Sequence, residues 1–316
     1  MQMNFRIALA VSLIVGSVAF AQTPRRAVPV VQETLAAQIM LDRVGFSPGE
    51  IDGRSGRNVQ EAVAAFQRAH ALEASGRLDP MTWRRLSERA GNHPPLVSYE
   101  ITDADVAGPF TPDIPADLME QSKLPALSYR QPLEALAEKF HASPQLLQQL
   151  NAGAAFGRGE RVMVPNVAAV DPLAPAPGSR PVGKLVVSKA TSSLTIQDNQ
   201  GQVLFHAPVT SGSEHDPLPV GMWKVTGVQQ MPEFHYNPAL FWDANPSHSK
   251  ARIAPGPNNP VGVVWIDISK EHYGIHGTPE PSRIGHVQSH GCVRLTNWDA
   301  QRVAMWARPG TTVIFE

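Results

Sequence analysis

The chain has 316 residues, is 42% hydrophobic and 17% charged, and has a formal net charge of −1. It is long enough for two or three small domains with buried cores, and a charge so close to zero excludes the broad basic surface of a nucleic-acid-binding protein. Its single cysteine, Cys292, excludes an internal disulfide, and its 29 prolines indicate linkers between domains.

Residues 1–21 have the features of a secretory signal peptide. Arg6 gives a positive start, residues 7–18 form a nearly unbroken apolar run, and Ala19-Phe20-Ala21 fits a cleavage site. The apolar run is too short to span a bilayer. We therefore expect cleavage after Ala21, no stable membrane insertion, and an exported protein that is periplasmic in a cell with an outer membrane.

Residues 32–90 predict a small domain of three helices. Apolar residues recur at helical spacing before and after the Gly- and Pro-rich loop GFSPGEIDGRSG, and Asp79 with Pro80 fits the start of a third helix. The loop, the helix AVAAFQ and the ending LDPMTWRRL resemble the peptidoglycan-binding domain 1 family. The resemblance implies a wall-binding domain, with Asp52-Gly53 and Phe66-Gln67 at its wall-facing and core signatures.

The middle of the chain predicts a second small unit between two linkers. Residues 91–125 contain six prolines and predict a linker, and the Pro/Ala-rich residues 168–181 predict another, extended one. Between them, residues 126–167 have two amphipathic helices, the second capped by Ser143 and Pro144, and a final strand RVMVPN. The βααβ order resembles a LysM module, which implies glycan binding.

Residues 182–316 predict a mainly-β domain. Short runs rich in β-branched residues are separated by turn signals such as DNQG. The runs are KLVVSK, SLTIQD, QVLFHAPV, MWKVTG, VVWIDI and TTVIFE. One helix is predicted to begin at Thr296 or Asn297.

Cys292 lies in the stretch YGIHGTPEPSRIGHVQSHGCVR with two histidines, His276 and His290. A thiol is nucleophilic only as thiolate, and a nearby histidine can take its proton. Gly291 permits a tight turn whose amides can form an oxyanion hole, and Arg294 suits a substrate carboxylate. The residues alone leave a buried, inert cysteine open, while a single thiol with this spacing fits no structural zinc site.

This stretch resembles the signature of the L,D-transpeptidase (YkuD) family, in which a histidine precedes SHGC and an arginine by a dozen residues. The similarity extends over the whole β-rich domain. It implies that Cys292 is the nucleophile, that His276 is the general base and that the Gly277 carbonyl orients the His276 ring. Proximity along the chain would instead favour His290 as the base.

The resemblance assigns further roles around the thiol. His290 would help to form the pocket and stabilise the oxyanion on the amides of Gly291 and Cys292. Ser289 and Tyr273 would be supporting positions, and Arg294 would meet the donor's charged groups. The reaction needs no metal and no organic cofactor. A flap is expected at 234–242, and His248 is a candidate residue of the cleft.

The implied partners are the stem peptides and glycan of peptidoglycan. A Cys292 thioester would form 3-3 cross-links or attach an outer-membrane lipoprotein to the wall. A hydrolytic L,D-carboxypeptidase or endopeptidase stays open, because it shares every residue up to the thioester. A catalytically silent wall-binding protein is the other alternative, although it would not need the intact histidine and SHGC motifs.

Overall fold

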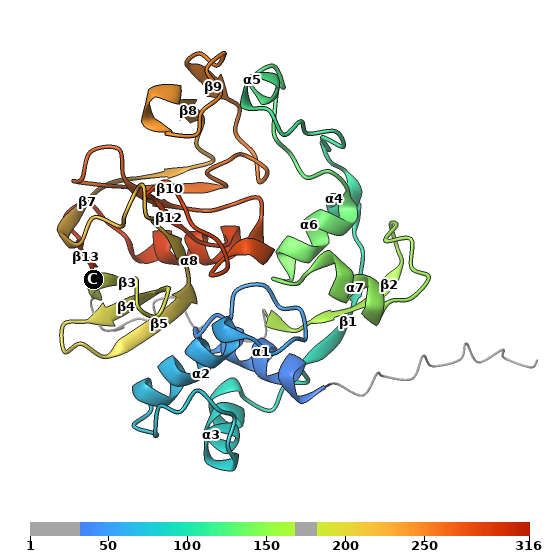
Figure 1. Ribbon diagram of the computed structural model, residues 1–316. Helices are drawn as coiled ribbons and strands as arrows, with labels where there is room; N and C mark the ends of the chain where they lie inside the picture. The colour runs from blue at the N-terminus through green and yellow to red at the C-terminus, as the bar shows by residue number, and fades with distance from the viewer. Residues whose placement is uncertain (1–31, 168–181) are drawn as a thin grey trace, which may run out of the picture. The chain divides into compact units, whose positions relative to one another are not determined.

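The computed structural model describes residues 32–167 and 182–316 (Figure 1). The expected signal peptide and the expected linker at 168–181 lie outside these residues. In the described ranges, no helix is long and apolar enough to cross a membrane.

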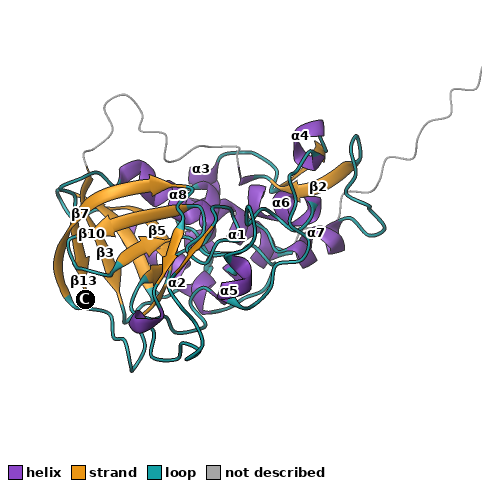
Figure 2. Cartoon of the chain, turned by 90° about the horizontal axis from the view of Figure 1, so that it is seen from above, coloured by secondary structure: helices purple, strands orange, loops and turns teal. Residues whose placement is uncertain are grey.

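The C-terminal part is built on a nine-stranded mixed sheet, with the strand order β5-β4-β3-β13-β7-β10-β11-β12-β6. Its strands are β3 (Val182–Ser188), β4 (Ser193–Asp198), β5 (Val203–Pro208), β6 (Thr210–Ser211), β7 (Gly221–Gln230), β10 (Val264–Ile268), β11 (Gly274–His276), β12 (Val293–Arg294) and β13 (Thr312–Phe315). Seen from above, β3, β13, β7 and β10 lie next to one another (Figure 2). The pairs β3–β13 and β11–β12 are parallel, and the others are antiparallel.

One helix, α8 (Asn297–Trp306), packs on this sheet and begins where the sequence predicted. Thr296 is its N-cap, and its hydroxyl accepts a hydrogen bond from the Asp299 amide. Ala300 and Val303 of α8 are buried in the same core as the alternate residues Val264, Ile266 and Ile268 of β10. The expected mainly-β C-terminal domain is therefore confirmed.

The N-terminal part consists of α1 (Glu33–Arg43), α2 (Arg57–Ala69) and α3 (Pro80–Ala90). Asp79 caps α3 by accepting from the Thr82 amide, with Pro80 in the first helical position, as the sequence predicted. Phe66 is fully buried in the core. Gln67 is also buried and holds the following turn by accepting from the Gly76 amide. The expected helical domain is confirmed.

The central module, defined here as residues 96–167, differs in extent from its prediction. β1 (Leu96–Glu100) pairs antiparallel with β2 (Arg161–Pro165), and the segment between them holds α4 (Asp103–Val106), α5 (Leu118–Gln121), α6 (Pro132–Lys139) and α7 (Pro144–Leu150). Residues 91–125, whose prolines predicted a linker, thus supply a strand and two short helices. Proline content did not reveal this strand, because its pairing partner lies about 65 residues further along the chain.

All three parts of the described chain belong to one compact unit that extends to Glu316. The N-terminal domain contacts the exposed edge of the sheet, where Ser47 N donates to His206 O (2.8 Å) and His206 N donates to Gly45 O (2.9 Å). Phe46 thereby forms a parallel bridge to β5. Covering an edge strand in this way satisfies its backbone groups and blocks pairing with other chains.

A buried polar cluster joins the three parts beside α8. Arg302 donates two hydrogen bonds to Asp42 of α1, at 2.9 and 3.0 Å, and His141 of the central module approaches the same carboxylate at 3.1 Å. Ser47 donates to Asp299 at 2.8 Å. Burial alone would raise the pKa of Asp42, but the charges of Arg302 and His141 outweigh it and hold that pKa well below its usual range.

Candidate active site

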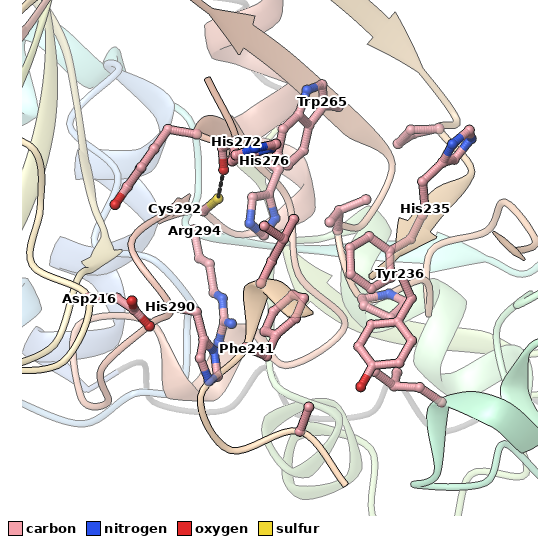
Figure 3. A pocket seen from close by; sticks show the side chains of 18 of the residues that line it. Asp216, His235, Tyr236, Phe241, Trp265, His272, His276, His290, Cys292 and Arg294 are labelled. Carbon is pink, nitrogen blue, oxygen red and sulfur yellow. Dashed lines mark hydrogen bonds between the residues drawn. The ribbon is translucent and has the colours of Figure 1, made fainter. Parts of the chain in front are cut away.

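Three side chains expected in the reaction line one cavity of about 1170 Å³, namely Cys292, His276 and Arg294 (Figure 3). β11 and β12 pair in parallel, with His276 directly opposite Arg294. Cys292 lies in the bend directly before β12, and its side chain lines the same cavity as Arg294. The topology therefore brings together residues that are sixteen positions apart in the sequence.

The His276 ring is held by its own neighbourhood. It is 3% exposed, and its Nδ1 lies 2.7 Å from the Gly277 carbonyl oxygen, the contact that the resemblance implied. Because a carbonyl oxygen only accepts, Nδ1 must hold the proton, which leaves Nε2 as the basic nitrogen. The Trp265 ring stacks on the imidazole with a centroid distance of 5.4 Å and an interplanar angle of 19°.

Both reacting groups are neutral at rest. Burial, reinforced by the charge of Arg294, lowers the pKa of His276 to about 3, although the hydrogen bond to Gly277 opposes the shift. Burial also raises the pKa of the Cys292 thiol, against the opposing effects of the Gly274 amide and Arg294. In the described parts of the chain, the thiol donates to the His272 carbonyl oxygen at 3.8 Å, and no hydrogen bond links it to His276.

The SHGC loop is fixed from both sides. The Ser289 hydroxyl donates to the Cys292 carbonyl oxygen and accepts from the Gly212 amide, both at 2.7 Å. Gly291 has φ 96°, and a Cβ atom there would lie 2.5 Å from the Tyr273 ring. Only glycine meets both conditions without strain. Ser289 and Tyr273 therefore determine the shape of the loop that carries the thiol.

Proximity along the chain suggested that His290 would act on Cys292. In the structure, His290 instead contacts another wall of the cavity. Its Nε2 lies 2.8 Å from Asp243 Oδ1, and its ring meets Phe241 edge to face at 5.1 Å. Phe241 belongs to the segment 234–242 that was expected to form a flap, and Asp243 directly follows it. The structure thus places His290 as a link between the SHGC motif and the flap, and His276 as the histidine beside β12.

Arg294 has unused donor capacity in the cavity. Among the described residues, its buried Nε atom has no hydrogen-bond partner. Burial lowers the pKa of Arg294, and the nearby Cys292 and Glu280 oppose the shift. A guanidinium remains charged at any physiological pH, so this position suits an anionic group of a ligand.

The flap is held by a segment that the sequence assigned to a linker. The flap contains β8 (Phe234–Tyr236) and the 3-10 turn Pro238–Leu240, and it is followed along the chain by β9 (Ala251–Ile253). His248 lines the cavity, as expected, and bridges Tyr236 (3.0 Å) to Asp117 at the start of α5 (3.1 Å). Leu127 packs with Tyr236 and Ile253 in a small separate core.

Sequence reasoning missed three residues that shape the cavity, which are Trp265, Asp243 and Asp117. Trp265 had a usable signal, because in VVWIDI it alternates with buried residues and so faces away from the core. Asp243 and Asp117 had none, because their partners are 47 and 131 positions away. In the described ranges, no three metal-binding side chains converge.

Comparisons with known proteins agree with two of the expected domains. Residues 183–315 match the L,D-transpeptidase catalytic domain (YkuD), and residues 31–86 match the putative peptidoglycan binding domain. The chain is 27% identical over 184 residues to the putative L,D-transpeptidase YkuD of Bacillus licheniformis, which covers 57% of this chain and 91% of that protein.

A second relative, the putative L,D-transpeptidase YqjB of Bacillus subtilis, is 30% identical over 147 residues, which cover 44% of this chain and 73% of the relative. Among solved structures, an L,D-transpeptidase from Mycobacterium smegmatis matches with a TM-score of 0.34 at 18% identity, over 42% of this chain and 57% of that one. The chain therefore spans less than two thirds of that solved protein.

Proposed function

The chain belongs to the L,D-transpeptidase (YkuD) family, and from this premise we propose that Cys292 is the nucleophile of an exported enzyme that acts on the tetrapeptide stems of peptidoglycan. One observation carries the proposal. His276 on β11, Arg294 on the adjacent parallel strand β12, and Cys292 just before β12 line the same cavity. A nucleophile, a base with a defined tautomer and a fixed cation are the groups that acyl transfer from a charged peptide requires.

The first step is attack by the thiol on a peptide carbonyl. Since Cys292 is protonated and His276 is neutral, no thiolate–imidazolium pair exists before the substrate binds. The Sγ proton passes to His276 Nε2 as Sγ forms a bond to the carbonyl carbon before the terminal D-alanine. The amides of Gly291 and Cys292 stabilise the resulting oxyanion.

The second step releases the terminal D-alanine. As the C–N bond breaks, His276 returns the proton to the departing amine, and a thioester remains on Cys292. The Gly277 carbonyl stabilises the imidazolium while it exists, because the Nδ1 hydrogen bond strengthens when the ring is charged. Arg294 pairs with a carboxylate of the donor peptide.

The acceptor decides the product. An amine of a neighbouring stem attacks the thioester to give a 3-3 cross-link, and a lysine of an outer-membrane lipoprotein gives a wall anchor. Water gives hydrolysis. Each acceptor attacks the same carbonyl carbon, and His276 takes its proton while the thiol is restored as the leaving group.

The accessory parts hold the enzyme on its substrate. Residues 31–86 match a putative peptidoglycan binding domain. The central module combines an antiparallel β1–β2 pair with α6 and α7 between the strands, which supports its LysM-like assignment and glycan binding. Linked weak binding sites raise the local concentration of the stem peptides around the cavity.

The nucleophile is tested by covalent labelling. The purified protein is incubated with a carbapenem and weighed intact by mass spectrometry. We expect one drug molecule on the wild-type chain, assigned to Cys292 by peptide mapping, and none on Cys292→Ala. A wild-type protein that is folded and stays unlabelled would refute the proposal.

The acceptor is tested with a disaccharide tetrapeptide and the wild-type protein. A cross-linked dimer with release of D-alanine supports transpeptidation, and tripeptide without dimer supports hydrolysis. Binding is tested separately by sedimenting residues 22–170 with purified sacculi. Failure to co-sediment would remove wall binding from the proposal and leave the chemistry untouched.

A further inference from the structure

The first turn of α8 is the place where both accessory parts meet the catalytic domain. Each of its first three residues contacts a different residue outside that domain. The pairs are Asn297 with Glu138 (2.9 Å), Trp298 with His141 (stacked rings, 5.2 Å) and Asp299 with Ser47 (2.8 Å). These three consecutive contacts tie the start of the helix to both accessory parts.

Asn297 also touches the backbone beside the proposed base. Its Oδ1 accepts from the Val263 amide at 3.2 Å. A Cβ atom built on Gly277 would overlap that same Oδ1 atom, so the two residues are in direct contact. The Asn297 amide therefore lies against the residue whose carbonyl orients the His276 ring.

The other end of the Asn297 amide is bound outside the catalytic strands. Nδ2 donates to Glu138 Oε2 at 2.9 Å and to the Pro257 carbonyl oxygen at 3.1 Å. Asn297 is 1% exposed, so bulk solvent has little access to these bonds. Its side chain can take only one orientation, because a flipped amide would turn a donor toward Val263 N and an acceptor toward Pro257 O.

We propose that Asn297, held in place by Glu138 of the central module, is a positioning residue for His276. The line of contact runs from Glu138 through the Asn297 amide to Gly277 and from the Gly277 carbonyl to His276 Nδ1. A small displacement of Gly277 changes the direction of the imidazole, and errors of about 1 Å in such geometry cost about 100-fold in rate. The inference rests on the proposed role of His276 as the base.

Glu138 is well suited to this task because both of its oxygens are occupied. Tyr129 donates to Oε1 at 2.8 Å while Asn297 donates to Oε2. Glutamine at this position can preserve both contacts, because its oxygen accepts from Asn297 and its nitrogen donates to the Tyr129 oxygen. Leucine has a similar size and preserves neither contact. The two substitutions therefore separate hydrogen bonding from packing.

The test compares the rate of Cys292 acylation by a carbapenem in the full-length protein. We expect Glu138→Leu to lower the maximal rate by about 10- to 100-fold with little change in the half-saturating concentration. Glu138→Gln should restore the rate to within about twofold of the wild type. Glu100→Gln is the matched control, since Glu100 lies in the same module and forms an exposed ion pair with Arg161.

A second readout does not depend on activity. Nitrogen-15 NMR of the His276 ring should show the proton on Nδ1 in the wild type and Glu138→Gln, and a mixture of tautomers in Glu138→Leu. Where Glu138→Leu fails to fold, Asn297→Asp replaces it, because the carboxylate keeps an acceptor for Val263 and loses the donor to Glu138.

The outcomes separate the two proposals. A folded Glu138→Leu protein with the wild-type acylation rate and a pure Nδ1–H tautomer would overturn the positioning role. A wild-type protein that is never acylated would instead refute the proposed nucleophile, and the tautomer comparison would still decide the role of Asn297.

Discussion

The buried ion pair between Asp42 and Arg302 gives the sharpest prediction about stability. Asp42 is fully buried, Arg302 donates two hydrogen bonds to it, and the Arg302 side chain is 12% exposed. Asp42→Asn removes the negative charge without changing the shape of the side chain. The guanidinium then loses its bidentate partner in a site with little access to water.

The cost follows from this geometry. Removing one partner of a buried pair destabilises a protein by about 3–5 kcal/mol. For a folded unit of this size, a loss of 1 kcal/mol in unfolding free energy lowers Tm by about 2–4 °C. Asp42→Asn should therefore lower Tm by about 10 °C. Replacing both residues together, Asp42→Leu with Arg302→Leu, should recover only part of the loss, because the buried Asp299, 3.6 Å from Arg302, then loses its own ion-pair partner.

Urea and thermal unfolding at pH 7 measure the effect, and Asp103→Asn is the matched control. Asp103 pairs with Arg158 at 2.6 Å, but the two side chains are 70% and 72% exposed. An exposed pair of this kind contributes less than about 1 kcal/mol. Equal losses for Asp42→Asn and Asp103→Asn would refute the argument that burial makes the first pair important for docking.

Three further outcomes follow from individual sites. Burial raises the pKa of Glu138 to about 7, so the protonated side chain, which the fold favours, is lost as pH rises through 7. The unfolding free energy of Glu138→Gln should therefore exceed that of the wild type by about 2–3 kcal/mol at pH 8. At pH 4 the two proteins should be equally stable. Burial lowers the pKa of His206 to about 4, so wild-type stability should fall by about 3 kcal/mol as pH drops from about 6.5 to 4, and His206→Gln should flatten that slope. Gly291→Ala places a Cβ atom against Tyr273 and should slow Cys292 acylation at least about 100-fold, whereas Gly310→Ala, with φ 92° and open space around it, should leave the acylation rate unchanged.

Local signals in the sequence predict several elements of the fold around the cavity. GIHG coincides with β11, SHGC directly precedes β12, and the Thr296 cap marks the start of α8. These signals are local because each depends on residues within one turn or one strand. The helical domain at 32–90 could be predicted for the same reason, since its periodicity is expressed within single helices.

The contacts between domains could not be predicted in this way. Asp42 and Arg302 are 260 positions apart, and Ser47 and Asp299 are 252 apart. Each is a polar residue on a helix or loop that would be suitable for a solvent-exposed surface. Only the fold reveals that they are buried and paired, so a pattern of hydrophobicity assigns them to the wrong environment. The proline-rich residues 91–125 were assigned to a linker for a related reason, because β2, the partner of β1, follows four intervening helices.

These contacts change how wall binding can assist catalysis. A domain on a flexible tether raises the local substrate concentration, and the gain declines slowly with tether length. A domain fixed by Asp42, Ser47 and Phe46 presents its surface at a defined position relative to the cavity. The increase in local concentration is then large for a stem peptide that can reach Cys292 while its glycan is bound. A stem peptide that cannot reach Cys292 gains nothing from glycan binding. If the proposed function holds, docking would convert a general increase in concentration into a selection among stem peptides, set by the same contacts that join the domains.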